Sequence, residues 1–225
     1  GKRRGVWVAQ LHGHGSTGDQ IFTRADLRAL WLPHYRRLGL GILSPNLRGN
    51  AWMGPDAAAD LRALLNWARN ALGAERFLFT SGSMGATGNL IYAVLHPEDA
   101  SAVAARCPAT DLAEYHAWLA AHPGGVRDEI RRAIESAYGG TPDEAPDSYS
   151  AHSALRHARR LTMPLHLSHG DADALIPVDQ SRRLASALTG KPNVTYTEIS
   201  GGNHDAPLKL RGALEWLERQ VMNGE

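Results

Sequence analysis

The stretch "FLFTSGSMGATGNL", residues 77–90, decides how the rest of the chain is interpreted. Four apolar or β-favouring residues are followed at once by small ones, with Ser83 between Ser81 and Gly85, and an apolar segment then begins without a spacer. This order predicts a strand that leaves through a turn too tight for bulky side chains and enters a helix. Because such turns display the side chain at their apex, Ser83 is the candidate nucleophile.

Short apolar runs recur along the chain and alternate with longer amphipathic segments. Besides "RFLFT" (76–80), the predicted strands are "GVWVAQL" (5–11), "LGILS" (40–44), "ASAVAARC" (100–107), "PLHLSH" (164–169) and "VTYTEIS" (194–200). The predicted helices are residues 26–39, 55–73, 85–98, 178–190 and 207–221. This alternation is typical of parallel βαβ units. The expected fold class is therefore α/β, a doubly wound, mostly parallel sheet of about six strands with its functional site at the carboxyl ends of the strands.

The alternation is interrupted between residues 108 and 160. Two amphipathic segments, 111–123 and 126–140, follow each other there with no strand between them. Because crossover helices already cover both faces of the predicted sheet, we expect this insertion to form a small helical cap over Ser83. No linker or break in composition divides the rest of the chain, so residues 1–225 are expected to form a single domain.

Charge and composition exclude several classes of partner. Lys and Arg number 24 against 23 Asp and Glu, so no nucleic acid partner is expected, and "GKRR" at residues 1–4 is predicted to be a frayed end. No run approaches the ~20 uncharged apolar residues of a membrane span, which favours a soluble protein without a membrane partner. Cys107 is the single cysteine. It excludes an internal disulfide and leaves the compartment open, either cytoplasmic or secreted after removal of a signal.

Three of the predicted strands end in loops that carry a reactive side chain. Ser83 follows residues 76–80, Asp171 and Asp173 follow residues 164–169 in "HGDADALIP", and His204 follows residues 194–200 in "SGGNHDAP". The carboxyl ends of parallel strands meet at one edge of a sheet, so we expect these loops to be neighbours. The order Ser, Asp, His is the order in which the α/β-hydrolase fold presents its catalytic triad.

Five stretches carry a family resemblance over nearly the whole chain. They are "LHGHGS" (11–16), "SPNLRGNAWMGPD" (44–56), "SGSMGATGNLIYAVLHPE" (81–98), "SYSAHSALRHARRLTMPLHLSHGDADALIPVDQSRRL" (148–184) and "GGNHD" (201–205). With them the chain resembles the α/β-hydrolase superfamily, and within it the catalytic domain of the prolyl-oligopeptidase group and its small stand-alone esterase relatives. The resemblance implies an α/β-hydrolase fold and makes Asp173 the acid rather than Asp171. The chain departs from the usual G-x-S-x-G turn by carrying Ser81 in the first small position.

The predicted roles follow from the chemistry of acyl transfer. His204 accepts the proton of Ser83 during attack and returns it to the leaving group, while Asp173 fixes the imidazole tautomer. The backbone N–H of Met84, directly after the nucleophile, is one expected oxyanion donor. By resemblance to relatives with the same "HG" loop, the N–H of His14 is the second. This chemistry requires neither a metal nor another cofactor.

The expected reaction is hydrolysis of carboxylic esters through an acyl-enzyme, on a small-molecule ester for which acylated sugars and aromatic esters are candidates. Trp52 and Met53 in "NAWMGPD", with Trp118 and Tyr138 of the insertion, are the candidate substrate-binding residues, since large apolar walls suit an uncharged acyl or alcohol group. The alternative is that these four side chains pack the insertion onto the sheet. Arg48 is a candidate for binding a substrate carboxylate.

Other functions compete with an esterase. One is a peptidase of the prolyl-oligopeptidase type, which we consider second because the 225 residues include no N-terminal propeller. Another is a metal-dependent hydrolase that uses His12, His14, Asp171, Asp173 and His204, although a metal site does not explain the small residues around the nucleophile. A third is a non-catalytic binding module, which typically lacks a member of the triad.

Overall fold

The computed structural model describes residues 5–223, and the predicted frayed end at residues 1–4 lies outside them. Its described strands are β1 (Val6–Ala9), β2 (Gly41–Leu43), β3 (Arg76–Gly82), β4 (Ala100–Arg106), β5 (Leu165–Gly170) and β6 (Val194–Ile199). They form one sheet in the order β2-β1-β3-β4-β5-β6, and every neighbouring pair is parallel. The predicted α/β class and the six predicted strands are confirmed.

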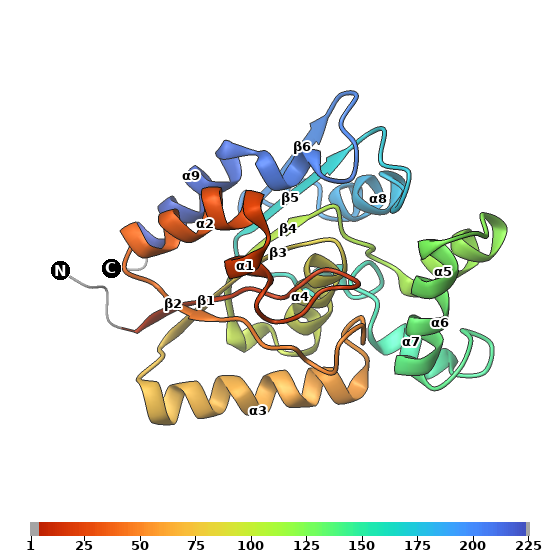
Figure 1. Ribbon diagram of the computed structural model, residues 1–225, viewed down its shortest axis with the longest axis horizontal. Helices are drawn as coiled ribbons and strands as arrows, with labels where there is room; N and C mark the ends of the chain where they lie inside the picture. Colours follow the sequence, from red (N-terminus) through yellow and green to blue (C-terminus); the bar gives the residue numbers. More distant parts are fainter. Residues whose placement is uncertain (1–4, 224–225) are drawn as a thin grey trace.

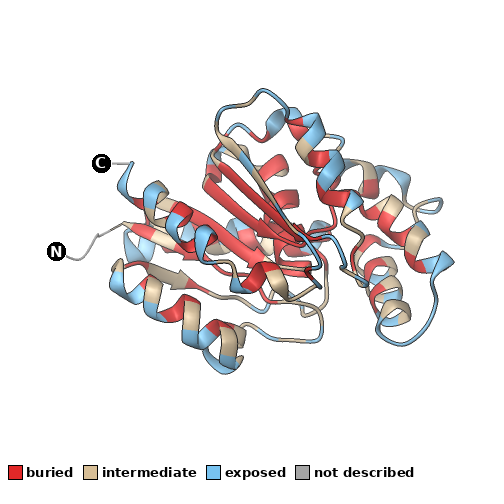
Figure 2. Ribbon diagram, turned by 90° about the horizontal axis from the view of Figure 1, so that it is seen from above, coloured by how far each residue is buried: buried red, intermediate tan, exposed pale blue. Residues whose placement is uncertain are grey.

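Helices cover both faces of this sheet, as Figure 1 shows. One face packs against α1 (Gln20–Thr23), α2 (Ala25–Arg37) and α9 (Arg211–Met222), and the other against α3 (Pro55–Leu72), α4 (Met84–Leu95) and α8 (Asp179–Ala187). The central strands are therefore buried on both sides (Figure 2). Burial on both faces explains why their sequences are continuous apolar runs rather than alternating ones.

The ends of α3 show how local sequence fixes an element. Pro55 occupies the first turn, where the missing N–H would have no helical partner, and Gly73 follows the helix with φ of 66°. Glycine adopts this left-handed conformation without a Cβ penalty, so the chain can reverse directly into β3. No helix among residues 5–223 combines the length and the apolar character that crossing a membrane would require.

The insertion forms α5 (Leu112–Ala121), α6 (Val126–Tyr138) and α7 (Pro146–Ala151), which lie together at one end of the molecule rather than on a face of the sheet (Figure 1). Both ends of the insertion are tied to Asp111, whose buried carboxylate caps α5 by accepting from Ala113 N. The same carboxylate accepts from Ser153 Oγ at 2.9 Å and from Arg156 Nε at 3.1 Å. Short η turns at Pro97–Asp99, Ala158–Arg160 and Ala206–Lys209 complete the described helical segments.

Candidate active site

Ser83 stands at the turn between β3 and α4, with φ of 57° and ψ of −129°. Residues other than glycine rarely adopt this backbone conformation, which costs of order 1–3 kcal/mol and persists only where the surroundings enforce it. The surroundings are tight: a Cβ at Gly85 would lie 2.3 Å from the carbonyl oxygen of Leu11. The Ser83 N–H donates to the carbonyl of Arg106 at 2.9 Å, which holds the turn onto β4.

Ser81, the departure from the usual turn, has a structural partner. Its Oγ accepts from the Leu11 N–H at 2.8 Å and lies 2.9 Å from the side-chain amide of Asn89. The hydroxyl is completely buried, and it joins the nucleophile turn to the loop that follows β1. Glycine would also fit at this position, but it has no hydroxyl to accept the hydrogen bond from Leu11.

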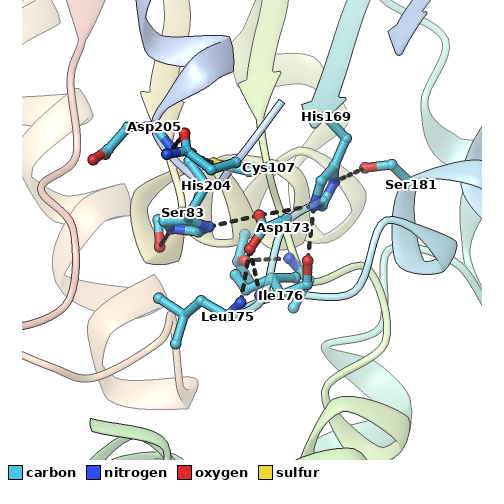
Figure 3. A network of polar contacts seen from close by, with 12 residues as sticks. Ser83, Cys107, His169, Asp173, Leu175, Ile176, Ser181, His204 and Asp205 are labelled. Atoms are coloured by element: carbon cyan, nitrogen blue, oxygen red, sulfur yellow. Dashed lines mark hydrogen bonds and ion pairs between the residues drawn. The ribbon is translucent and has the colours of Figure 1, made fainter. Parts of the chain in front are cut away.

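His204 lies between Ser83 and Asp173, as Figure 3 shows. Its Nε2 is 2.9 Å from Ser83 Oγ, and its Nδ1 is 2.6 Å from Asp173 Oδ2. Asp171 lies apart, because its side chain is exposed and accepts from the Gly201 N–H at 2.6 Å. The structure thus brings together Ser83, Asp173 and His204, and leaves Asp171 outside the group.

A close backbone approach makes this meeting possible. The loops after β5 and β6 touch at Gly170, where a Cβ would lie 2.1 Å from the carbonyl oxygen of Gly202. Glycine at position 170 therefore lets the loop carrying Asp173 lie directly against the loop carrying His204.

The carboxylate of Asp173 is fully buried and accepts four hydrogen bonds. Oδ1 accepts from the N–H groups of Leu175 and Ile176, and Oδ2 accepts from His204 and from Nε2 of His169 at 3.1 Å. Burial alone would raise the pKa of Asp173, but the bonds from His169, His204 and Ile176 lower it well below its usual range. The group is thus held as a carboxylate.

Sequence reasoning assigned no chemistry to His169, although it contacts the acid directly (Figure 3). Its Nε2 also lies 2.9 Å from the carbonyl oxygen of Ile176, which can only accept, so Nε2 carries a proton. The Nδ1 lies 2.7 Å from Ser181 Oγ on α8. The only sequence signal was its place four residues before Asp173, which in a loop does not predict contact.

Several neighbours act on the imidazole of His204. Burial lowers its pKa, whereas the Cys107 sulfur and the Asp173 carboxylate raise it, and the net direction is upward from the ordinary value of 6.5. Cys107 Sγ also lies 3.3 Å from the backbone carbonyl of His204. The lone cysteine, at the end of β4 with φ of 45°, therefore packs against the backbone of the candidate base.

The loop after β1 is braced by side chains from two other segments. The Gly13 N–H donates to Gln20 Oε1 at 3.0 Å, and the Gly15 N–H donates to Asn50 Oδ1 at 2.8 Å. His12 is buried and lies 3.0 Å, through Nε2, from the carbonyl oxygen of Asn46. These contacts fix the backbone around His14 without using the His14 N–H itself.

The side chain of His14 has a partner of its own. Trp52 Nε1 lies 3.2 Å from His14 Nδ1, and because an indole nitrogen can only donate, Nδ1 accepts. Burial lowers the pKa of His14, in agreement with a neutral ring. Trp52, a candidate substrate-binding residue from the sequence, thus positions the loop that carries His14.

A cavity of about 140 Å³ lies beside Ser83 and His204. Its apolar wall includes Val126 and Ile130 of α6 and Leu175 of the loop after β5. Its polar wall comes from β4, from Gln20 of α1 and from the loops after β1, α1 and β6. The polar lining residues are Gln10, His14, Gln20, Arg24, Arg106 and Asp205.

The four predicted substrate-binding residues do not line this cavity. Trp52 and Met53 are buried, and they line a separate small pocket. Tyr138 is buried and donates to the carbonyl oxygens of both residues, at 3.0 Å and 3.3 Å. Trp118 is half-buried and stacks on His122. The structure gives all four packing contacts, so their role in substrate binding stays a prediction.

The fold does not bring together all five residues that the sequence offered as metal ligands. Among residues 5–223, the group of possible ligand atoms that lie within 4.8 Å of one another comes from Cys107, Asp173 and His204. His12 and His14 contribute nothing to it, because their ring nitrogens face backbone carbonyls and the Trp52 indole. Asp173 and His204 in turn are already bonded to each other.

Solved structures of several hydrolases have the same fold. An S-formylglutathione hydrolase from Agrobacterium tumefaciens superposes with a TM-score of 0.70 at 14% identity, covering 97% of this chain and 84% of its own. Est1E from Butyrivibrio proteoclasticus gives 0.72 at 15% identity, covering 99% and 90%. The esterase Pf2001 from Pyrococcus furiosus gives 0.67 at 18% identity, covering 99% and 82%.

Sequence comparison identifies the family. No curated protein sequence matches the chain. A model of the prolyl oligopeptidase family matches residues 48–221, which include the turn at Ser83 and both loops that carry Asp173 and His204. With most of its length in that match and an α/β-hydrolase fold around it, the chain belongs to the prolyl oligopeptidase family of serine hydrolases.

Proposed function

We propose that this protein hydrolyses carboxylic esters of small molecules through an acyl-enzyme formed on Ser83. One observation carries the proposal: the His204 ring lies within hydrogen-bond reach of Ser83 Oγ on one side and of the buried Asp173 carboxylate on the other. A serine hydroxyl becomes a useful nucleophile when a positioned base removes its proton, and the base must itself be oriented. Both conditions are met here.

In the proposed reaction, Ser83 Oγ attacks the ester carbonyl carbon while His204 Nε2 takes its proton. The imidazolium donates that proton to the leaving alcohol, and the carboxylate of Asp173 stabilises the positive ring. Water then attacks the acyl-enzyme with the same ring as base, which releases the acid and restores Ser83.

The negative oxygen of each tetrahedral intermediate needs donors, which we assign to the N–H groups of Met84 and His14. Met84 is the first residue of α4, where backbone N–H groups lack helical acceptors. Within residues 5–223, no acceptor engages the His14 N–H. Each such donor typically contributes about 3–4 kcal/mol to stabilising the transition state.

The fold around the site supports an esterase role. Solved structures with this fold include a protein described as an esterase, Pf2001 from Pyrococcus furiosus. We infer that the described residues act as one α/β-hydrolase domain and that residues 108–160 form its cap, because α6 lines the cavity beside Ser83. An apolar cap wall suits an uncharged acyl or alcohol group and keeps water from the reacting centre.

The proposal is tested with p-nitrophenyl esters, a serine-directed fluorophosphonate and a chelator. The wild-type protein should turn over the esters, be labelled and inhibited by the fluorophosphonate, and be unaffected by the chelator. Ser83→Ala should fold normally, escape labelling and lose about 10⁶-fold in kcat, because the nucleophile is absent. Retention of more than about a thousandth of kcat, or inhibition by the chelator, would contradict the assignment.

A further inference from the structure

Arg106, the last residue of β4, is completely buried. Its guanidinium carbon lies 3.9 Å from the ring centroid of Trp31, and its Nη1 donates to Thr80 Oγ1 at 2.9 Å. The other two nitrogens, Nε and Nη2, have no hydrogen-bond partner among residues 5–223. One edge of the guanidinium is therefore unsatisfied.

The charge of Arg106 is also uncompensated. None of the ion pairs among residues 5–223 includes it, and the nearby Tyr35 hydroxyl donates to Gln10 at 2.9 Å. Burial lowers the pKa of Arg106, and no carboxylate opposes that effect. Buried charges in proteins are normally paired, because an unpaired one costs several kcal/mol. The fold therefore maintains an unpaired cation.

The free nitrogens are arranged for one kind of partner. Nε and Nη2 lie on the same edge of the planar guanidinium, and their N–H bonds point in parallel. This is the edge that binds both oxygens of a carboxylate at once. A water molecule can bond to the edge, but it leaves the positive charge unpaired.

Arg106 also lies close to the candidate reacting groups. Arg106 lines the cavity that holds Ser83 and His204, and it pairs in register with Gly82, the residue before the nucleophile. The flexible side chains of Gln10, Leu27 and Leu208 line the same cavity.

Other arginines near the site are already occupied. Arg24, which also lines the cavity, donates to both Asp26 and Asp205. Arg48, the candidate from the sequence, is paired with Asp56 and Asp60 at an exposed position. Arg106 alone among these three lacks an acidic partner.

We propose that the cavity binds substrates with a carboxylate remote from the ester, and that the free edge of Arg106 pairs with it. The inference rests on the proposed esterase function and specifies its substrate class as half-esters of dicarboxylic acids. Because Nε and Nη2 are buried, this binding requires side chains of the cavity wall, such as Gln10, Leu27 and Leu208, to move aside. The guanidinium is buried, so the pair forms at a low local dielectric and is stronger than in water.

The test compares matched substrates. The probes are p-nitrophenyl esters of dicarboxylic acids from succinate to suberate, with the far carboxyl either free or capped as its methyl ester, each corrected for spontaneous hydrolysis. For the best chain length, kcat/KM of the wild-type protein should be about 10- to 100-fold higher with the free carboxylate, the range for a hydrogen bond to a buried charge. A ratio of one or below for every length would mean that the edge holds internal water only, and would overturn the proposal.

Variants test whether Arg106 causes the preference for a free carboxylate. In Arg106→Gln the ratio should fall to about one, and in Arg106→Lys, which keeps the charge but loses the fork, it should be intermediate. Arg24→Gln removes a cavity arginine without a free edge and should keep most of the ratio. Equal loss in both glutamine variants would overturn the assignment to Arg106.

Two controls keep the conclusion clear. Should Arg106→Gln not fold, the free dicarboxylates serve as competitive inhibitors of the wild-type protein, and they should bind at least tenfold better than their monoamides. Turnover of the capped esters and labelling by fluorophosphonate report on the proposed esterase function separately. Activity and labelling without carboxylate preference would remove only this inference.

Discussion

The buried carboxylate of Asp173 is shared between two imidazoles, and this sharing separates it from Asp171. Asp173→Asn should lower kcat by about 10⁴-fold, because an amide can hold His204 in the wrong tautomer. Asp171→Asn should lower kcat by less than about tenfold, since the exposed Asp171 side chain accepts from the exposed Gly201 N–H and makes no hydrogen bond to His204. Steady-state kinetics on one neutral ester would check the ranking. The reverse order would make Asp171 the acid.

Residues whose position follows from the order of loops could be predicted from the sequence. Ser83, His204 and the pair Asp171 and Asp173 each follow a strand, and parallel strands bring such loops to one edge, where the structure places Ser83, Asp173 and His204 together. The choice of Asp173 over Asp171 came from the family resemblance and not from the order of the loops. Ser81 and His169 were outside this reasoning. The partner of Ser81 is Leu11, 70 residues away, and that of His169 depends on how the next loop folds back.

Among the elements, α6 contributes the apolar wall of the cavity, so the acyl group should be selected there. Val126 is 46% exposed and lines the cavity, so Val126→Ala should widen it with little loss of stability. We expect the optimum of kcat/KM to move toward longer p-nitrophenyl esters, by about three- to tenfold in relative rate. Because Val126 is only half-buried, we expect the change in relative rate to be no larger than about tenfold, the lower limit for one methylene group in a closed pocket.

Trp118→Ala is the matched control, because Trp118 belongs to the neighbouring helix but does not line the cavity. Its chain-length profile should stay that of the wild-type protein. If Trp118→Ala shifts the profile and Val126→Ala does not, Trp118 contributes to substrate selection, as the sequence had suggested for it and three other residues.

The pattern of apolar residues was sufficient for the sheet and for most helices. The central strands β3, β4 and β5 are short and apolar because both of their faces are buried, and that burial leaves a signal in the sequence. The six-residue α7 was not predicted, since it is shorter than two helical turns and buries one residue, Tyr149. The aromatic residues of the insertion indicated a substrate wall, but apolar composition does not distinguish a side chain that packs from one that binds.

At the scale of the whole molecule, stability should fall in weak acid because of His166. This histidine is buried, its Nδ1 has no hydrogen-bond partner within the described part of the chain, and burial together with the charge of Arg106 lowers its pKa to about 4. The unfolded chain, with an ordinary value of 6.5, binds more protons between these limits. The stabilising contribution is therefore complete above pH ~6.5 and is lost toward pH ~4, on the order of 3 kcal/mol in total.

Urea unfolding at pH 7 and at pH 5 measures this dependence. His166→Leu removes the titrating group, so the difference in unfolding free energy between the two pH values should shrink by about 1–2 kcal/mol. Asp173 does not interfere, because a carboxylate with a lowered pKa loses its contribution only below pH ~4. An unchanged difference would show that other groups control acid sensitivity.

The positive φ of Ser83 presents the candidate nucleophile but lowers the conformational stability of the protein. Ser83→Ala keeps a Cβ and hence the backbone strain, whereas Ser83→Gly removes the strain. Both variants should be inactive, but the glycine variant should have its unfolding midpoint at a higher urea concentration. We expect a difference of about 1 kcal/mol, since the gain is reduced by the greater freedom of glycine in the unfolded chain. Equal midpoints would mean that the turn is relaxed. The trade-off implies that laboratory selection for thermal tolerance alone would favour replacing the nucleophile, so any such selection on this scaffold needs a simultaneous demand for turnover.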